Sequence, residues 1–393
     1  MISVNGMREP SNPSSSESDE KVVMPHRGGN KAFIILALVV AAIVIIAAAF
    51  ATGLFSGGAS EESVTITGAG ATFPMPLILK WADEYHNETN GKVKVNYGGG
   101  GSGAGITQIK DKHVEFAGTD APLSASESTT YGLVHIPDTL GAVAVAYNEL
   151  NLLALKLDGP TLSRIFMKNI TVWGDPAIAA LNPGITLPTD QITTVVRSDS
   201  SGTTFVFSGY LAAVSQEFDS LYGQGKSVNW PNAIGASGNP GVTQTVRTTP
   251  HSIGYIELAY AIQNQVPFAQ LKNHDGNFVT PSLETTSAGA AASSTLPSGD
   301  GDWSQVNILD APGANSYPIA SFSYILIYKE LYNGQTKMNR TAAEALVEFL
   351  WWVVHSDGQS YADELYYAPL PTSVVSGNEA TLNSITYNGE SLR

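Results

Sequence analysis

The chain has 393 residues, of which 43% are hydrophobic and 14% charged, so it can bury a sizeable core and form about two domains. Its 20 lysines and arginines stand against 35 aspartates and glutamates, and the net charge of −15 argues against a nucleic-acid-binding surface, which needs a basic face. The sequence contains no cysteine, which excludes disulfides, thiolate catalysis, cysteine–zinc sites, iron–sulfur clusters and a lipidated N-terminal cysteine.

The N-terminal region predicts a membrane anchor. Twenty consecutive apolar residues, Ala32–Ala51, would form a helix of about 30 Å, the thickness of a bilayer core. A cleaved signal peptide is the alternative, but its apolar region is usually about 7–15 residues long and lies nearer the N-terminus. Arg27 and Lys31 precede the run, which would leave the N-terminus inside the cell and the rest outside. We therefore expect a disordered cytoplasmic tail over 1–31, a transmembrane signal anchor over 32–55 and a tether over 56–62.

Short hydrophobic runs separated by glycine, serine and proline predict alternating strands and helices in the rest of the chain. We first expect strands over Val64–Thr67, Val93–Tyr97, Val114–Gly118 and Gly141–Tyr147, and helices over Pro76–Tyr85 and Ile106–Lys112. Further along, we expect strands over Thr194–Arg197 and Tyr324–Tyr328, a strand, turn and helix start over Ile253–Ala261, and a surface loop over 284–302. A capping box at Thr341–Glu344 predicts a helix through Val354. The alternation indicates an α/β fold with a mostly parallel sheet.

Three of the expected strand-to-helix junctions share a chemistry. They place hydroxyl groups and backbone N–H groups at Thr72-Phe73, Ser102-Gly103 and Ser201-Gly202-Thr203. The first turn of a helix has unpaired N–H donors and a partial positive charge, which together attract anions. Asp120 and Arg197 are expected at neighbouring strand ends, where open α/β sheets bind their ligands. The combination predicts an anion-binding site.

Other glycine-rich sites fit the sequence less well. There is no P-loop motif, and Gly68-Ala-Gly70 lacks the third glycine of a dinucleotide-binding turn. Gly100–Ala104 resembles the nucleophile turn of serine hydrolases around Ser102 but lacks its last glycine. His251 and His274 are the downstream candidates for a catalytic base, and no histidine has a spacing typical of metal binding. A serine hydrolase or phosphatase that uses Ser102 stays open as an alternative.

Several motifs together resemble one family. They are Ile66–Pro74 (ITGAGATFP), Lys80–Asp83 (KWAD), Asn96-Tyr97 with its glycine run, Thr119–Ser124 (TDAPLS), the stretch around Trp173 (VWGDPAIAALNPG), Val195–Thr203 (VVRSDSSGT), Ile253–Tyr255 (IGY) and Tyr366–Val374 (YYAPLPTSV). Over nearly all of residues 63–375, the chain is similar to the periplasmic phosphate-binding protein of the high-affinity phosphate ABC importer, the PstS family. The resemblance implies a two-lobed periplasmic-binding-protein-like (type II) α/β fold with a hinge and an enclosed phosphate. We place one lobe at 63–142 plus 318–393 and the other at 143–317.

The resemblance also implies which residues bind the ligand. By position, the phosphate contacts fall on Thr72, Phe73 through its N–H, Ser102, Asp120, Arg197, Ser201, Gly202 and Thr203. Two positions depart from the family pattern, since Gly103 stands where a second serine is frequent and Ser200 where glycine is common. No catalytic residue, metal site or cofactor is implied. The expected partners are inorganic phosphate, the permease subunits of an ABC importer and the membrane through the N-terminal helix, and we expect a monomer.

Asp120 predicts how phosphate would be selected. An ionised carboxylate only accepts hydrogen bonds, so it can accept one from the proton that phosphate keeps near neutral pH, whereas sulfate has no such proton. The resemblance, together with the expected anchor, implies a membrane-anchored, extracytoplasmic phosphate receptor for an ABC importer and not an enzyme. The alternatives are a receptor for another oxyanion, the hydrolase or phosphatase named above, and a surface sensor that keeps the fold without transport.

Overall fold

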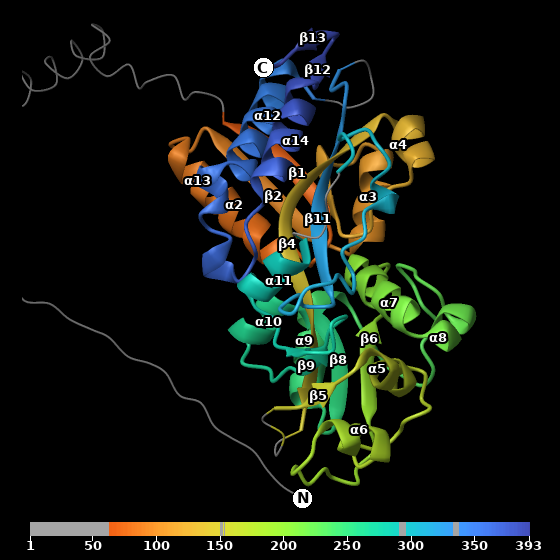
Figure 1. The fold of residues 1–393 in the computed structure, drawn as a ribbon. Coiled ribbons are helices and arrows are strands. Elements are labelled where there is room, and N and C mark those ends of the chain that lie inside the picture. Colours follow the sequence, from red (N-terminus) through yellow and green to blue (C-terminus); the bar gives the residue numbers. More distant parts are fainter. Residues whose placement is uncertain (1–62, 150–151, 153, 291–295, 333–337) are drawn as a thin grey trace, which may run out of the picture. The chain divides into compact units, whose positions relative to one another are not determined.

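The computed structural model describes residues 63–149, 152, 154–290, 296–332 and 338–393, and Figure 1 shows their fold. The predicted tail, anchor and tether all fall within residues 1–62 and lie outside the described residues. Among the helices that the structure describes, none combines the length and the apolar character needed to cross a bilayer.

One eight-stranded sheet runs through the described part of the chain, in the order β2-β1-β3-β11-β4-β8-β6-β7. Its strands are β1 (Val64–Gly70), β2 (Val93–Gly99), β3 (Phe116–Thr119), β4 (Leu133–Asn148), β6 (Thr193–Arg197), β7 (Ile234–Ala236), β8 (Ser252–Glu257) and β11 (Ala320–Tyr328). The outer strand pairs are parallel, whereas the contacts of β11 with β3 and β4, and of β4 with β8, are antiparallel. The expectation of a mostly parallel sheet is therefore right for the two wings and wrong for the centre, because β4 leaves the first wing and β11 returns to it.

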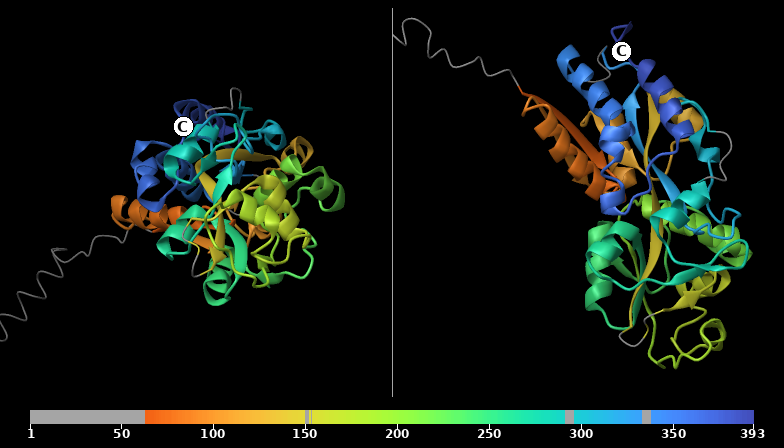
Figure 2. Two further views of the ribbon diagram at one scale, coloured as in Figure 1. Left: turned by 60° about the horizontal axis from the view of Figure 1, so that its bottom comes forward. Right: turned by 60° about the vertical axis from the view of Figure 1, so that its left-hand side comes forward.

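Helices pack against each wing of this sheet, as Figures 1 and 2 show. Next to β1, β2, β3 and the first half of β4 lie α2 (Met75–Glu88), α3 (Ser102–Lys110), α4 (Ala125–Tyr131), α12 (Arg340–Val354), α13 (Ser356–Gln359) and α14 (Thr372–Asn383). Towards β6, β7 and β8 lie α5 (Gly159–Phe166), α6 (Pro176–Leu181), α7 (Gly202–Val214), α8 (Gln216–Leu221), α9 (Gly238–Thr248) and α10 (Leu258–Gln263). The remaining elements are β5 (Lys156–Leu157), β9 (Gln270–Lys272), β10 (Phe278–Val279), α11 (Leu283–Ala290), the 3-10 turns Trp303–Gln305 and Asp363–Leu365, and the hairpin β12 (Thr386–Tyr387) with β13 (Glu390–Ser391).

The buried side chains form two hydrophobic clusters, and these define two α/β domains. The first cluster surrounds β1, β2 and β3 and contains Trp81 and Phe349; we call this part domain 1. The second surrounds β6 and β8 and contains Trp173 and Phe207; we call it domain 2. Each cluster buries large aromatic side chains completely or nearly so, which is the main source of stability for each domain.

Strand β4 belongs to both domains. The sequence predicts a strand only over Gly141–Tyr147, but in the structure the strand extends over Leu133–Asn148. Pro137 disfavours a strand because it has no N–H group to donate, but the pairing with β11 on either side of it outweighs this preference. Residues up to Ala142 pair with β11, and residues from Val143 onward pair with β8. The same strand therefore changes partner between one domain and the other.

The predicted surface loop over 284–302 is partly wrong. Its first residues form helix α11, Leu283–Ala290, which contacts β4 and β11. Gly289 and Ala290 are buried there, since their small side chains let the helix approach the sheet closely. The small residues that suggested a loop in the sequence thus form the face of α11 that packs against the sheet.

The predicted capping box of α12 is also wrong. The helix begins at Arg340, and its N-cap is Asn339, whose Oδ1 accepts a hydrogen bond from the Ala342 N–H at 2.8 Å. Glu344 instead accepts a hydrogen bond from Arg340 Nε at 2.9 Å, one helical turn earlier. The predicted end at Val354 is confirmed.

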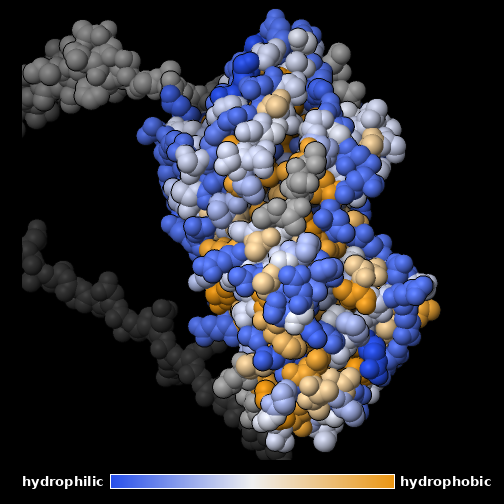
Figure 3. Space-filling view, in the orientation of Figure 1, coloured by the Kyte–Doolittle hydropathy of each residue, from blue (hydrophilic) through white to orange (hydrophobic). Residues whose placement is uncertain are grey.

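The face of the described residues in Figure 3 is mainly hydrophilic, with hydrophobic areas scattered over it. The most exposed large hydrophobic side chain among the described residues is Leu221 at the end of α8, 65% exposed. The hydrophobic surface on this face is therefore dispersed and not gathered in one patch.

Candidate anion-binding site

Four helix starts meet between the two domains. Domain 1 contributes the start of α3 at Ser102 and the turn before α2 that carries Thr72, and domain 2 contributes the starts of α7 and α9. Thr72 Oγ1 accepts a hydrogen bond from the backbone N–H of Asn239 in α9 at 3.0 Å. A Cβ atom on Gly202 in α7 would overlap Ser102 Oγ, so these two helix starts touch. The three junctions picked out in the sequence therefore converge, and α9 adds a fourth.

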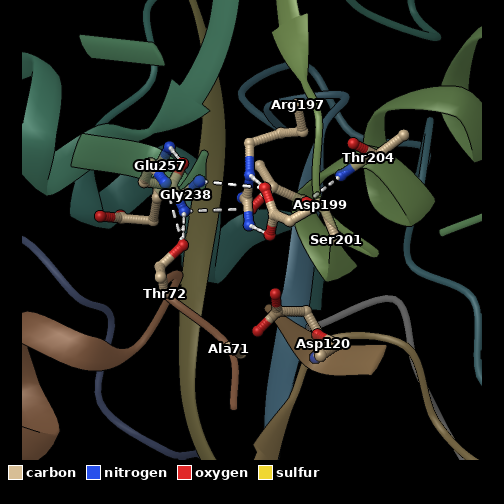
Figure 4. A network of polar contacts seen from close by, with 12 residues as sticks. Ala71, Thr72, Asp120, Arg197, Asp199, Ser201, Thr204, Gly238 and Glu257 are labelled. Atoms are coloured by element: carbon tan, nitrogen blue, oxygen red, sulfur yellow. Dashed lines mark hydrogen bonds and ion pairs between the residues drawn. The ribbon is translucent and has the colours of Figure 1, made fainter. Parts of the chain in front are cut away.

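The structure also brings together and buries the side chains of the predicted site residues (Figure 4). Their exposed fractions are 0% for Ser102, Ser201, Thr203 and Phe73, 2% for Asp120, 5% for Thr72 and 6% for Arg197. Phe73 differs from the others because its ring packs in the hydrophobic cluster of domain 2. Its carbonyl accepts a hydrogen bond from the Tyr367 hydroxyl at 2.7 Å, which fixes the backbone of the turn before α2.

Arg197, at the end of β6, is held in place but retains free donors. Its Nε donates to Asp199 Oδ1 at 2.8 Å, its Nη2 donates to Asp199 Oδ2, and its Nη1 donates to Thr203 Oγ1 at 3.0 Å. Asp199 Oδ1 also accepts from the Gly238 N–H at 2.9 Å. A guanidinium group has five N–H donors, so two of them have no partner among the described residues. These two donors remain for a ligand.

Four buried hydroxyl groups of the site accept hydrogen bonds without donating one within the described residues. Thr72 Oγ1 accepts two from Asn239, from its N–H at 3.0 Å and from Nδ2 at 3.1 Å, and Thr203 Oγ1 accepts from Arg197 and, at 3.1 Å, from Asn239 Nδ2. Ser102 Oγ accepts from the Asp120 N–H at 3.2 Å, and Ser201 Oγ accepts from the Thr204 N–H at 3.0 Å. A hydroxyl has a single proton and two lone pairs. Lone pairs of these four hydroxyl oxygens are used by neighbouring donors, whereas their four protons have no acceptor among the described residues and can be donated to a ligand.

Asp120 faces these donors with a free carboxyl oxygen. Its Oδ1 accepts from Ser323 Oγ at 3.1 Å, and its Oδ2 is buried without a hydrogen-bond partner. Figure 4 shows the carboxyl group on the opposite side of the site from Arg197 and Asp199. Burial raises the pKa of Asp120 to about 7, although the Ser323 hydrogen bond and the charge of Arg197 act in the opposite direction. Near neutral pH the Asp120 carboxyl group is therefore present in two forms, an ionised form that only accepts hydrogen bonds and a protonated form that can donate one.

Several residues of the site escaped the sequence analysis. Asn239 orients both threonine hydroxyls, Asp199 holds Arg197, and Ser323 orients Asp120. Asn239 lies in the run Gly238–Gly241 (GNPG), a glycine-rich helix start of the kind that was recognised elsewhere in the chain. Ser323 carries no local signal, because it reaches Asp120 across 203 residues of sequence.

The two positions that depart from the family pattern lie against each other. The Gly103 N–H donates to the Ser200 carbonyl at 2.9 Å, which joins domain 1 to domain 2. A Cβ atom on Gly103 would overlap Ser200 Oγ, so the serine occupies the space that a side chain at 103 would need. One departure therefore accommodates the other.

The hydrolase alternative gains no support from the contacts of Ser102. His251 Nδ1 lies 2.6 Å from Glu149 Oε2, and His274 Nδ1 lies 3.3 Å from Asp310 Oδ2, so each candidate base is engaged with another carboxylate. Ser102 itself accepts from a backbone N–H and has no side-chain base as a hydrogen-bond partner within the described residues. Residues that could ligate a metal form no group of three in the described part of the chain. The arrangement can bind an oxyanion, and no side-chain base in the described ranges is hydrogen-bonded to Ser102.

The ion pair between Arg197 and Asp199 predicts a large and pH-dependent stability effect. Burial raises the pKa of Asp199, but the hydrogen bonds and charge of Arg197 outweigh it and hold that pKa below its ordinary value. Asp199→Ala should lower the free energy of unfolding by about 3–5 kcal/mol at neutral pH, because it leaves a buried guanidinium group unpaired. A depressed carboxyl pKa stabilises the folded state above the unfolded pKa of about 3.9, so the loss should shrink as the pH falls below that value. Urea unfolding of the wild type and the variant at several pH values measures the loss of unfolding free energy and its dependence on pH.

The matched control is Asp300→Ala, which removes the exposed pair of Asp300 with Lys329. It should cost at most about 1 kcal/mol. Equal losses for the two substitutions would contradict the proposed importance of the buried pair.

Comparisons with known proteins support one family. Residues 57–357 match the model of the PBP superfamily domain. The chain is 43% identical over 326 residues to the phosphate-binding protein PstS of Xylella fastidiosa, covering 81% of this chain and 85% of that protein. It is 38% identical over 331 residues to the PstS of Methanocaldococcus jannaschii, covering 78% and 84%. These relatives are named as binding proteins and not as enzymes, in agreement with the expectation of a receptor.

A solved structure agrees with the fold. The phosphate-binding protein of Stenotrophomonas maltophilia has a TM-score of 0.62 at 21% identity, over 81% of this chain and 94% of that one. The two-domain α/β architecture is therefore that of the periplasmic binding proteins, as expected from the sequence. The chain belongs to the PBP superfamily and, within it, to the family of the phosphate-binding protein PstS.

Proposed function

We propose that the protein is a receptor that binds inorganic phosphate between its two domains and delivers it to the permease subunits of an ABC importer. The observation that carries the proposal is the surplus of buried donors around one free carboxylate oxygen. Among the described residues, four hydroxyl protons and two guanidinium N–H groups have no acceptor, while Asp120 Oδ2 has no donor. A tetrahedral oxyanion that still carries a proton satisfies both.

In this function the eight residues predicted from the sequence would bind phosphate. The hydroxyls, Arg197 and the backbone N–H groups of Phe73 and Gly202 donate, and Asp120 accepts. Each hydrogen bond to a charged group contributes about 1.5–3 kcal/mol, so a handful of them suffice for tight binding. The net charge of −15 repels phosphate at long range, but salt screens that repulsion beyond about 8–10 Å.

Asp120 would supply the discrimination between phosphate and sulfate. Ionised Asp120 accepts the proton of phosphate, whereas sulfate would bring a second acceptor against Oδ2 and leave both unpaired. A site built around a ligand proton can reject the ligand that lacks it by about 10⁴–10⁵-fold. Since the pKa of Asp120 is raised to about 7, a protonated Asp120 could donate to sulfate in more acidic solution, and selectivity should weaken there.

Replacing Asp120 tests this mechanism. Asp120→Asn should weaken phosphate binding and strengthen sulfate binding, because the asparagine amide can donate to a fully deprotonated oxyanion. Calorimetric titration with phosphate, arsenate and sulfate measures the affinities, and arsenate should behave like phosphate. Asp300→Asn, a surface change, is the control and should leave the ratios as in the wild type. A phosphate-to-sulfate ratio that is the same in wild type and Asp120→Asn would refute the role of Asp120.

The enclosed site requires the domains to open and close. We place the lobes at 63–142 plus 318–393 and at 143–317, with a hinge where β4 changes partner. The partner change between Ala142 and Val143 supports this boundary. The overlap that a Cβ on Gly202 would make with Ser102 and Asp120 supports a closed arrangement in which the two domains touch around the ligand.

Closure should be visible in solution. Small-angle scattering of the wild type should show a smaller radius of gyration after phosphate is added. Gly202→Ala should remain folded but neither close fully nor bind tightly, because its methyl group would collide with Ser102 and Asp120 of the other domain. Gly377→Ala in α14, where an added Cβ meets nothing within 4 Å, is the control. Scattering curves of the wild type that do not respond to phosphate would argue against the hinge.

The receptor would work at the outer face of the cell membrane as a monomer. A single-pass anchor over 32–55 is supported by the apolar run and by the basic residues before it, with the C-terminal part outside. Cells that produce the full chain should retain it in the membrane fraction, and a chain that begins at residue 62 and is exported should be released. Release of both forms would remove the anchor from the proposal.

A further inference from the structure

Asp138 is a second carboxyl group close to the site, and an irregularity of β4 turns it inward. Thr139 pairs with Ser323 of β11, and Pro137 pairs with the next residue, Tyr324, so Asp138 is an extra residue in the ladder. Such a bulge leaves the extra residue unpaired and redirects its side chain. The Asp138 side chain is completely buried.

The backbone of this bulge is held firmly, whereas the carboxyl group has no partner. Gln359 Nε2 donates to the Asp138 carbonyl at 3.0 Å, and Asn378 Nδ2 donates to the Pro137 carbonyl at 2.8 Å. Neither oxygen of the Asp138 carboxyl group has a hydrogen-bond partner among the described residues. Contacts from α13 and α14 therefore hold the bulge in a position that leaves the Asp138 carboxyl group buried and without a hydrogen-bond partner among the described residues.

The titratable groups that face Asp138 are acids, and none of them supplies a positive charge. Its titratable neighbours are Asp120 from the end of β3, Tyr97 from β2 and Tyr324 from β11. Ser323 of β11 is the polar group nearby, and its hydroxyl donates to Asp120. The site's cation, Arg197, is paired with Asp199. Burial, reinforced by the negative charge of Asp120, raises the pKa of Asp138 to about 8, although the backbone N–H groups of Asp138 and Thr139 and the Ser323 hydroxyl act in the opposite direction.

We propose that Asp138 is a positioning residue for phosphate selection, which stays a neutral acid while the site works and so allows Asp120 to remain ionised. This inference rests on the proposed phosphate function. Two adjacent buried carboxylates repel each other, so the free energy is high when both are ionised. A charge on Asp138 would therefore raise the pKa of Asp120 and favour its protonated form. Protonated Asp120 could no longer accept from phosphate, and the ionised Asp138 would repel the anion. Phosphate affinity should therefore decline in alkaline solution as the Asp138 proton is lost to solvent.

The test compares the wild type with Asp138→Asn, which has the same shape and is neutral at every pH. Calorimetric titration of the full chain with phosphate gives the ratio of the two Kd values, in which the ionisation of phosphate itself cancels. The ratio of wild-type to variant Kd should be near one at about pH 6 and should rise to about tenfold at about pH 9, one unit above the Asp138 pKa. Asp300→Asn is the control and should follow the wild type at each pH.

A spectroscopic readout separates a change in charge from a change in packing. The infrared spectrum of the wild type at neutral pH should contain a band of a buried protonated carboxyl group that Asp138→Asn lacks and Asp300→Asn keeps. If Asp138→Asn does not fold, the smaller neutral variant Asp138→Ser replaces it in both measurements. A wild-type spectrum from which Asp138→Asn removes no protonated carboxyl band at neutral pH overturns the inference by itself.

The outcomes are distinguishable. A wild type that binds phosphate with a Kd ratio that stays constant from about pH 6 to about pH 9 overturns the role of Asp138 and leaves the receptor function intact. A wild type that binds no phosphate at any pH overturns the proposed function, and the role of Asp138 with it.

Discussion

The site depends on the burial of one guanidinium group, that of Arg197, whose charge is balanced but whose N–H donors are not all used. Asp199 balances the charge of Arg197 through two hydrogen bonds, and Thr203 accepts a third. The remaining donors are enclosed between two domains, where an unsatisfied polar group costs free energy that it would not cost in water. A bound oxyanion would accept from these donors and remove that cost. The contacts that position Arg197 therefore also favour the binding of an anion.

The sheet brings these donors together because it is shared by the two domains. Parallel wings direct the carboxyl ends of β3 and β6 and the starts of α3 and α7 toward the middle of the molecule. The antiparallel centre, built from β4 and β11, connects the wings, and Ser323 of β11 contacts Asp120 there. Domain 1 thus supplies Asp120 and domain 2 supplies Arg197, and only the assembled pair forms a complete set of donors and acceptor.

Three acidic side chains at or near the site are buried. Burial raises the pKa of Asp120, Asp138 and Glu257 above their ordinary values. Glu257 accepts from the Ala259 N–H at 2.9 Å and contacts the Tyr367 hydroxyl at 3.0 Å, and it supports the turn that carries Phe73. Each raised pKa means that the folded state binds a proton that the unfolded chain has released, so the ligand-free protein loses stability as the pH rises from about 4 toward 8. Because neutral Asp138 and Glu257 carry no charge, the electrostatic field at the site comes from Arg197, Asp120 and the helix starts.

The sequence by itself determined the α/β class, the helix starts at Ser102 and Ser201, and the paired presence of Asp120 and Arg197. These are local properties, because glycine and serine patterns specify where a helix begins and which hydroxyls stand at its first turn. Only the tertiary structure decided that Asn239 joins Thr72 to Thr203 and that Ser323 reaches Asp120, since these partners lie 167, 36 and 203 residues apart. Strand pairing likewise decided the length of β4 and the inward turn of Asp138, because cross-strand contacts outweigh the local preferences of a proline and an aspartate.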